Sequence, residues 1–403
     1  MKRDEEKTAM KIINGNVYTP RFRFEKRGIS VRGGRFAGLS ADPPARQLPD
    51  EDAGCGEAVV DAAGCYVIPG LIDIHFHGCM GADFCDGTKE AIRTLARYEA
   101  GQGVTAICPA TLTLPVETLI KVLRCAADYV RDSHDPDEAD LVGINMEGPF
   151  ISRAKKGAQN EAYILPCDER VCGSFLEASE GLVKIIGLAP EENPGFRDYI
   201  ASVKDRVRVS LAHTNADYET AMAAFESGAC HAVHLFNAMP PLLHRAPGVV
   251  GAVRDCRTVM AELICDGNHV HPSVVRAAFD MLGEDRIVLI SDSLRACGMG
   301  DGIMMLGGQE VEVHGSLATL TRSGALAGSV CSLMQCMRTA VLQMGIPLET
   351  AVRCATGNPA RAIGIQDEYG TIEEGKRADC VLLDEKDLSV RGVIKDGDLC
   401  FYR

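Results

Sequence analysis

The middle of the chain repeats one pattern eight times: a short apolar run followed by a polar stretch and a helix-forming segment. The runs are LIDIHFH (71–77), VTAICPAT (104–111), LVGINMEGPF, VKIIGLAPEE, VRVSLAHT, HAVHLFNAM, TVMAELICDGNHV and IVLISDS (287–293). Amphipathic segments such as KEAIRTLARYEAGQG, VETLIKVLRCAADYVRDS and ADYETAMAAFESG lie between them. Runs that are apolar throughout are typical of strands buried on both faces. The pattern predicts an α/β fold, a (β/α)8 TIM-type barrel over residues 69–365.

A doubly wound open sheet is the competing arrangement of such strands and helices. No G-x-G-x-x-G follows the first apolar run, which argues against a dinucleotide-binding version of that sheet. Both ends of the chain have a different pattern, because KIINGNVYTP, GISVRGGRFAGLS and the closing GTIEEGKRADCVLLDEKDLSVRGVIKDGDLCFYR alternate short β-rich runs with turns. These ends predict one small β-sandwich domain, formed by residues 1–68 and 366–403, with a loop from Ala41 to Gly56.

Composition argues against several classes of protein. The net charge is −14, which is unfavourable for a nucleic-acid partner. No apolar run approaches the roughly 18 residues that span a bilayer, and the charged start MKRDEEKTAM has no hydrophobic segment behind it, so neither a membrane span nor a signal peptide is expected. The 17 cysteines form no C-x-x-C pair and lie mainly in apolar runs. Reduced core cysteines and a cytoplasmic location are therefore expected.

The first apolar run ends in two histidines, His75 and His77. Residues i and i+2 of a strand point to the same face, so these imidazoles would lie side by side. Taken alone, the pair could equally be two structural histidines. In a barrel, however, the active site forms where the strands end, and the other predicted strands end in or near Glu147, His213, His234, His269 and Asp292. Five of the chain's ten histidines lie at these ends, which predicts a metal site.

Histidine and carboxylate ligands without cysteine suit Zn²⁺ or Fe²⁺ in a catalytic site with an open position. Such a metal acidifies bound water and polarises a carbonyl oxygen. Asp292, in ISDS at the end of the last run, is best placed to take the water's proton and return it to a leaving group. The alternative for Asp292 is an ordinary cap at the end of a strand.

The segments VIPGLIDIHFHG, NMEGPF, LAHTNA, HLFNAM, DGNHV and ISDS resemble, in this order, motifs of the amidohydrolase superfamily, and more narrowly the N-acetylglucosamine-6-phosphate deacetylase family. The resemblance extends from the first β-rich run to GTIEEGKRADCVLLD. Dihydroorotases, hydantoinases and ureases of this superfamily bridge two metals with a modified lysine on the fourth strand, where this chain has LAPEE and no lysine. The resemblance implies metal-dependent hydrolysis of the N-acetyl group of N-acetyl-D-glucosamine 6-phosphate to D-glucosamine 6-phosphate and acetate.

The resemblance also implies residue roles. Glu147, His213 and His234 become the ligands of the main metal, and Asp292 the general base and then the general acid. The substrate contacts would be Ala158, Asn237, Ala238, Arg245, His269 and the turn Leu326, Ala327 and Gly328. Arg245 would bind the phosphate of a neighbouring subunit's substrate, which implies a homodimer. Without the resemblance, Arg245 would be interpreted as a solvated loop charge.

Two departures from the family pattern leave questions open. Some members have Gln and Asn in place of the H-x-H pair and use one metal, whereas His75 and His77 permit a second metal, bridged by Glu147. Gln159 stands where certain members have a histidine that contacts the substrate carbonyl. The alternatives are an N-acetylgalactosamine-6-phosphate deacetylase, another amidohydrolase, or a barrel that serves as a non-catalytic scaffold. A substrate panel separates the first two from the expected enzyme, and metal analysis separates the third.

Overall fold

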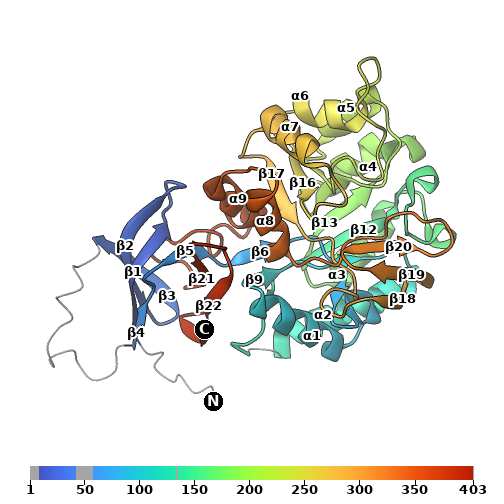
Figure 1. The fold of residues 1–403 in the computed structure, drawn as a ribbon. Helices are drawn as coiled ribbons and strands as arrows, with labels where there is room; N and C mark the ends of the chain where they lie inside the picture. The colour runs from blue at the N-terminus through green and yellow to red at the C-terminus, as the bar shows by residue number, and fades with distance from the viewer. Residues whose placement is uncertain (1–8, 42–57, 133–134, 403) are drawn as a thin grey trace, which may run out of the picture.

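The computed structural model describes residues 9–41, 58–132 and 135–402 (Figure 1). The charged start of the chain and nearly all of the loop expected from Ala41 to Gly56 lie outside these residues. No helix in the described ranges has both the length and the apolar composition that a membrane crossing requires.

Each of the eight apolar runs contains a parallel strand. The strands are β6 (Leu71–Asp73), β9 (Val104–Ile107), β10 (Ala110–Thr111), β11 (Asp140–Leu141), β12 (Ile144–Phe150), β13 (Val183–Leu188), β14 (Arg208–Leu211), β15 (His231–Ala232), β16 (Met260–Ile264) and β17 (Ile287–Ile290). They pair in the orders β10-β12-β13-β14-β15-β16-β17 and β11-β9-β6. Every residue of β6, β9, β12 and β17 is buried, as continuous apolar runs require. All these strands run the same way, so their carboxyl ends lie at one end of the sheet.

Helices surround these strands (Figure 1). They are α1 (Lys89–Gly101), α2 (Val116–Asp132), α3 (Glu169–Ala178), α4 (Phe196–Val203), α5 (Tyr218–Ser227), α6 (Gly248–Asp255), α7 (Pro272–Leu282), α8 (Leu333–Leu342), α9 (Leu348–Ala355) and α10 (Gly357–Ile363). Side chains at their starts accept otherwise unpaired amide hydrogens: Thr88 caps α1, Asp168 caps α3, and Ser332 forms a capping box with Gln335. The apolar faces of the helices pack with the strands in one large hydrophobic core.

Strands from both ends of the chain share a second sheet, drawn in blue and red at one side of the molecule (Figure 1). It contains β1 (Met10–Tyr18), β2 (Phe24–Arg32), β3 (Arg35–Ala41), β4 (Ala58–Asp61), β5 (Cys65–Pro69), β21 (Cys380–Asp384), β22 (Val390–Lys395) and β23 (Asp398–Tyr402). Antiparallel pairing of β5 with β21 joins the N-terminal to the C-terminal strands. This sheet has a hydrophobic cluster of its own, which includes Val17, Ile29 and Leu382.

A three-stranded antiparallel sheet follows the last parallel strand, β17, and was not anticipated from the sequence. It consists of β18 (Gly302–Leu306), β19 (Gln309–His314) and β20 (Leu317–Leu320). Leu306 and the nearby Leu326 reach a pocket at the carboxyl ends of the parallel strands. A smaller pair, β7 (Gly78–Cys79) with β8 (Ala82–Asp83), follows the first parallel strand. The loops at this end and the β18–β20 sheet therefore contribute to the wall of the pocket.

Candidate metal centre and active site

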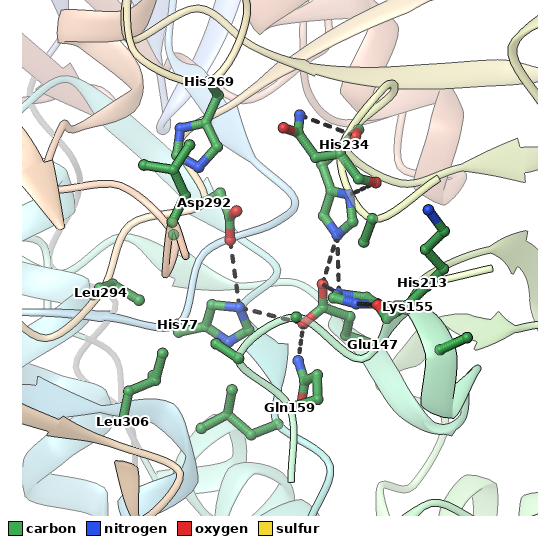
Figure 2. Close-up of a pocket in the computed structure, with 18 residues that line it drawn as sticks. His77, Glu147, Lys155, Gln159, His213, His234, His269, Asp292, Leu294 and Leu306 are labelled. Atoms are coloured by element: carbon green, nitrogen blue, oxygen red, sulfur yellow. Dashed lines mark hydrogen bonds and ion pairs between the residues drawn. The ribbon is translucent and has the colours of Figure 1, made fainter. Parts of the chain in front are cut away.

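A pocket of about 310 Å³ opens at the carboxyl ends of the parallel strands (Figure 2). The predicted site residues that line it are His77, Glu147, Ala158, His213, His234, Asn237, Ala238, His269, Asp292, Leu326 and Gly328. Gln159, Lys155, Leu112, Leu294 and Leu306 also line it. Polar groups thus gather at the floor of the pocket, with apolar side chains along part of the wall (Figure 2).

The first candidate metal group consists of Glu147 on β12, His213 after β14 and His234 after β15. Oε1 of Glu147 lies 2.9 Å from Nε2 of His213 and 2.9 Å from Nε2 of His234, and the two imidazole nitrogens are 3.2 Å apart. All three side chains are buried, and one ligand atom from each lies within 4.8 Å of the others. This is the donor set that the sequence predicted for the main metal.

A second group shares Glu147 and adds the two histidines of the first run. Nε2 of His75 lies 3.4 Å from Glu147 Oε1, and Nε2 of His77 lies 3.5 Å from Glu147 Oε2. Nε2 of His75 is buried and has no hydrogen-bond partner among the described residues. A buried, unpartnered imidazole nitrogen aimed at a carboxylate is what a metal-binding position provides. Both groups therefore fit a divalent metal that favours nitrogen and oxygen ligands.

Backbone carbonyls orient two of the ligand rings. Nδ1 of His213 lies 2.8 Å from the carbonyl oxygen of Lys155, and Nδ1 of His234 lies 3.1 Å from that of Asn237. A carbonyl can only accept, so each Nδ1 carries a hydrogen, and Nε2 is the nitrogen that the neutral ring would offer to a metal. Metal-binding histidines are commonly fixed in this way by their second nitrogen.

The charges of the cluster support cation binding. Burial raises the pKa of Glu147, but the adjacent His213 and His75 outweigh it and hold that pKa well below its usual range. For His213, burial acts to lower the pKa, yet the Glu147 carboxylate raises it above the usual value. The carboxylate therefore stays ionised, and the His213 imidazole holds its proton more firmly than a free imidazole does. A bound divalent cation replaces such protons when metal binds.

Three of these side chains sit on strained backbone. His213, His234 and Asp292 have φ values of 43°, 25° and 50°, in the left-handed region that non-glycine residues rarely adopt. Such conformations cost on the order of 1–3 kcal/mol each and cluster at functional sites. Each of the three residues lies two positions after the end of a parallel strand, β14, β15 or β17.

Asp292 and Glu147 both approach Nε2 of His77, from different directions (Figure 2). Oδ1 of Asp292 is 3.4 Å from Nε2 of His77 and 3.9 Å from Nε2 of His75. Burial raises the pKa of Asp292, but the contact with His77 and the nearby histidine charges lower it below its usual value. The ionised carboxylate can therefore accept a proton at the pocket floor, as the general-base prediction requires.

Gln159 is engaged with Glu147 and the backbone. Its Nε2 donates to Oε2 of Glu147 at 2.5 Å, and its Oε1 accepts from the amide of Thr113 at 2.7 Å. The side chain is 4% exposed, so both ends of the amide are committed inside the protein. In this structure Gln159 fixes the orientation of the shared carboxylate.

Two of the predicted substrate contacts do not line the pocket. Ala327 is 1% exposed and packs in the cluster formed with the β18–β20 sheet. Arg245 is exposed on the loop that precedes α6, and its guanidinium contacts the ring of His244. This single chain therefore brings together the other predicted residues, whereas Arg245 does not line the pocket of its own chain.

Three polar residues near the site escaped the sequence-based prediction. Lys155 lines the pocket, and its Nζ donates to the carbonyl of Met239 at 3.2 Å. Oδ2 of Asp266 lies 2.8 Å from Nδ1 of His269. Burial acts to lower the pKa of His269, but the Asp266 carboxylate outweighs it and raises that pKa above the usual value. Glu262 on β16 lies beneath the histidines. A lone glutamate in an otherwise apolar strand is a signal that could have indicated it.

Comparison with known proteins agrees with this geometry. The sequence profile described as the amidohydrolase family matches residues 66–400. An N-acetylglucosamine-6-phosphate deacetylase of Bos taurus is 35% identical over 389 residues, covering 93% of this chain and 91% of the relative. An N-acetylgalactosamine-6-phosphate deacetylase of Escherichia coli O157:H7 is 34% identical over 334 residues, covering 83% of this chain and 87% of that protein.

Among solved structures, a mutant of N-acetyl-D-glucosamine-6-phosphate deacetylase from Mycobacterium smegmatis, in complex with N-acetyl-D-glucosamine-6-phosphate, superposes with a TM-score of 0.87. It is 30% identical, and the match covers 98% of this chain and 99% of that one. The match extends over both the parallel strands and the sheet formed by the chain ends. The chain therefore belongs to the amidohydrolase family, among its N-acetylglucosamine-6-phosphate deacetylases.

Proposed function

We propose that this enzyme hydrolyses the N-acetyl group of N-acetyl-D-glucosamine 6-phosphate to D-glucosamine 6-phosphate and acetate. The observation that carries the proposal is the convergence of four imidazoles on the Glu147 carboxylate, with Asp292 beside them at the floor of the pocket. In a chain of this family, that arrangement supplies both a metal centre and a proton shuttle for amide hydrolysis.

Glu147, His213 and His234 would hold the main metal, and His75 and His77 with Glu147 a second. Zn²⁺ or Fe²⁺ suits these ligands, and when bound it supplies Lewis acidity that polarises the amide carbonyl and acidifies water. One or two ions per subunit are compatible with the two groups.

Asp292 would move the proton. Its carboxylate takes a proton from the attacking water, whose oxygen bonds to the acetyl carbon. It then gives that proton to the amine nitrogen as the carbon–nitrogen bond breaks. The products are acetate and the free amino sugar, so one water is consumed for each amide cleaved. Oδ1 of Asp292 lies 3.4 Å from Nε2 of His77, so this carboxylate borders the second metal group.

Cations at the wall of the pocket would hold the phosphate. Lys155 lies on the wall and is bonded to a neutral carbonyl, and His269 carries a pKa raised by Asp266. Asn237, Ala238 and the Leu326–Gly328 turn would contact the sugar. Binding energy from these remote groups positions the scissile amide over the metal centre.

The direct test is release of free amine from N-acetyl-D-glucosamine 6-phosphate by the wild type and by Asp292→Asn. The variant should lose at least a hundredfold in kcat, the usual contribution of a positioned acid–base group, and keep the wild-type metal content. Asp168→Asn is the matched control, because asparagine still caps α3. Wild-type turnover by Asp292→Asn would contradict the shuttle.

The relative from Escherichia coli O157:H7 makes N-acetylgalactosamine 6-phosphate a second candidate substrate. The two sugars differ in the orientation of one hydroxyl group. Measuring kcat/KM for both in parallel decides between them, and the glucosamine compound should give the higher value.

A homodimer with a shared site is our proposal for Arg245. Arg245 is exposed and does not line the pocket of its own chain, and its planar guanidinium suits a phosphate. Mixing inactive Arg245→Ala with inactive Asp292→Asn subunits should restore activity, because each mixed dimer contains one site with an intact Asp292 and an intact Arg245. Failure of all mixtures to recover activity would contradict a shared site.

We further propose a closed (β/α)8 barrel over residues 69–365 and a β-sandwich domain formed by residues 1–68 and 366–403. The amide of Asp292, after β17, donates to the carbonyl of His75, after β6, at 2.9 Å, which supports closure between the last strand and the first. The pairing of β5 with β21 supports the joint domain. A cytoplasmic location is proposed because every cysteine in the described ranges is free.

A further inference from the structure

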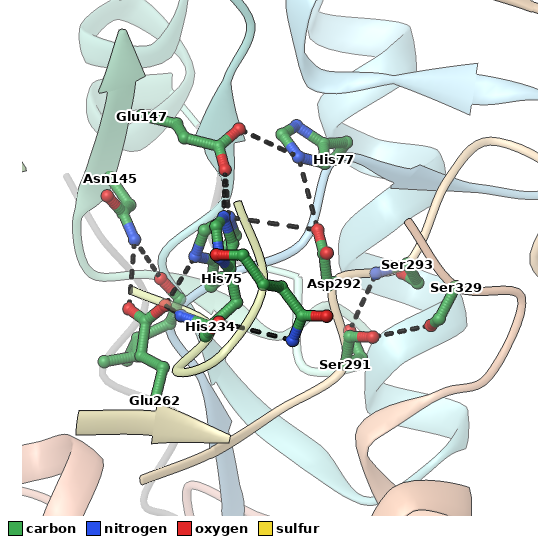
Figure 3. Close-up of polar contacts among 12 residues, drawn as sticks. His75, His77, Asn145, Glu147, His234, Glu262, Ser291, Asp292, Ser293 and Ser329 are labelled. Carbon is green, nitrogen blue, oxygen red and sulfur yellow. Dashed lines mark hydrogen bonds and ion pairs between the residues drawn. The ribbon is translucent and has the colours of Figure 1, made fainter. Parts of the chain in front are cut away.

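The carboxylate of Glu262 lies close to His75, His234 and Asn145 (Figure 3), and it receives four N–H donors in all. Its Oε2 is 2.6 Å from Nδ1 of His75 and 3.2 Å from the amide nitrogen of His234. Its Oε1 is 2.9 Å from Nε2 of His231 and 3.4 Å from Nδ2 of Asn145. The Glu262 side chain is 0% exposed, so these donors take the place of water.

Each of these contacts reaches a predicted ligand or a residue close to one in the chain. His75 and His234 are predicted ligands, His231 lies three residues before His234, and Asn145 lies two residues before Glu147. Glu262 on β16 therefore links β6, β12 and β15 from the inside of the sheet. A buried carboxylate is stable only while its donors stay in position, because an unpaired buried charge is costly.

The contact with Glu262 decides which nitrogen of His75 is free. Because the carboxylate accepts the Nδ1 hydrogen, Nε2 carries the lone pair, and Nε2 is the atom that lies 3.4 Å from Glu147 Oε1 without a hydrogen-bond partner in the described chain. His213 and His234 differ, because backbone carbonyls hold their Nδ1 atoms. A side-chain substitution can thus release His75 and leave the other two rings held.

We propose that Glu262 is a positioning residue for a second metal: it fixes His75 in the tautomer and orientation that let His75, His77 and Glu147 bind a divalent ion. The inference rests on the proposed function, in which this centre is metal-dependent. Carboxylate partners of metal-binding histidines typically change metal affinity by about 10- to 100-fold when they are removed.

The experiment measures metal binding rather than turnover. Wild-type protein, Glu262→Gln and Glu262→Leu are stripped with a chelator and titrated with Zn²⁺ in a calorimeter, and metal content is measured on protein purified without chelator. Glutamine keeps one acceptor oxygen for four donors and leucine keeps none, so the loss should be graded. Glu138→Gln is the matched control: Glu138 is 3% exposed and paired with Arg93 and Arg97 away from this cluster.

We expect two Zn²⁺ per subunit for the wild type and for Glu138→Gln. In Glu262→Gln the second ion should bind at least tenfold more weakly, and in Glu262→Leu it should be lost, while the first ion keeps its affinity. If leucine prevents folding, the glutamine variant carries the test. Two ions at wild-type affinity in Glu262→Gln, or equal weakening of both, would overturn the inference. If either of these two results is found while the wild type still turns over its substrate, only the inference about Glu262 fails and the proposed function stands. A wild type that binds no Zn²⁺ and shows no turnover would overturn the inference and the proposed function together.

Discussion

Glu99, on α1, is a buried carboxyl group with no role in the proposed chemistry, and we predict that replacing it with methionine stabilises the protein. Its side chain is 0% exposed, and neither carboxylate oxygen has a hydrogen-bond partner among the described residues. Burial, together with the nearby Asp73, raises the pKa of Glu99 well above its usual value, so the folded protein holds it protonated. Methionine has a similar length and helix propensity, which preserves the packing.

The expected gain is about 2 kcal/mol, because a buried polar group without a partner costs roughly 1–3 kcal/mol. Unfolding entropy of about 2.1 cal/mol/K per residue over 403 residues makes this gain a rise in Tm of about 2–3 °C. The gain should depend on pH. Above the ordinary carboxyl pKa of about 4.3 the unfolded wild type loses the Glu99 proton while the folded state keeps it, so the wild type loses stability as pH rises.

Differential scanning calorimetry of Glu99→Met and wild type, at mildly acidic and at neutral pH, measures both effects. Glu90→Met is the control, because Glu90 is an exposed carboxylate on the same helix, and surface substitutions usually change stability by less than about 0.5 kcal/mol. A lower Tm for Glu99→Met, or a gain that shrinks as pH rises, would refute the assignment of a protonated, unpartnered group.

Three further predictions concern the pocket. Asp266→Asn should lower the raised pKa of His269, so that the increase in KM with rising pH begins at a lower pH than in the wild type; KM profiles across the neutral range check this. Lys155→Met should raise KM about tenfold for the phosphorylated substrate, a loss of about 1.4 kcal/mol, and leave turnover of unphosphorylated N-acetylglucosamine unchanged in a steady-state assay. Gly187→Ala would place a Cβ 2.4 Å from the Glu147 carbonyl oxygen, so we expect about 1–3 kcal/mol of destabilisation and faster metal loss on dialysis, measured by calorimetry and metal analysis.

The sequence alone determined the alternation of strands and helices. In runs such as 287–290 every position is apolar, a composition typical of strands covered on both faces. The polar residues that close the runs were equally readable: Glu147, His213 and Asp292 interrupt apolar stretches at the ends that parallel strands bring together. The periodicity of these runs is a local property of the chain, so it needs no knowledge of the tertiary structure.

The tertiary structure alone decided how these side chains use their atoms. Gln159 binds Glu147 and Thr113. Glu262 accepts hydrogen bonds from His75 and Asn145, which lie more than a hundred positions away from it in the chain. The sheet at 302–320 became a pocket wall only through its packing against Leu112 and Leu294. Hydrogen-bond partners, tautomers and exposure depend on neighbours distant in sequence, and only the folded chain brings those neighbours together.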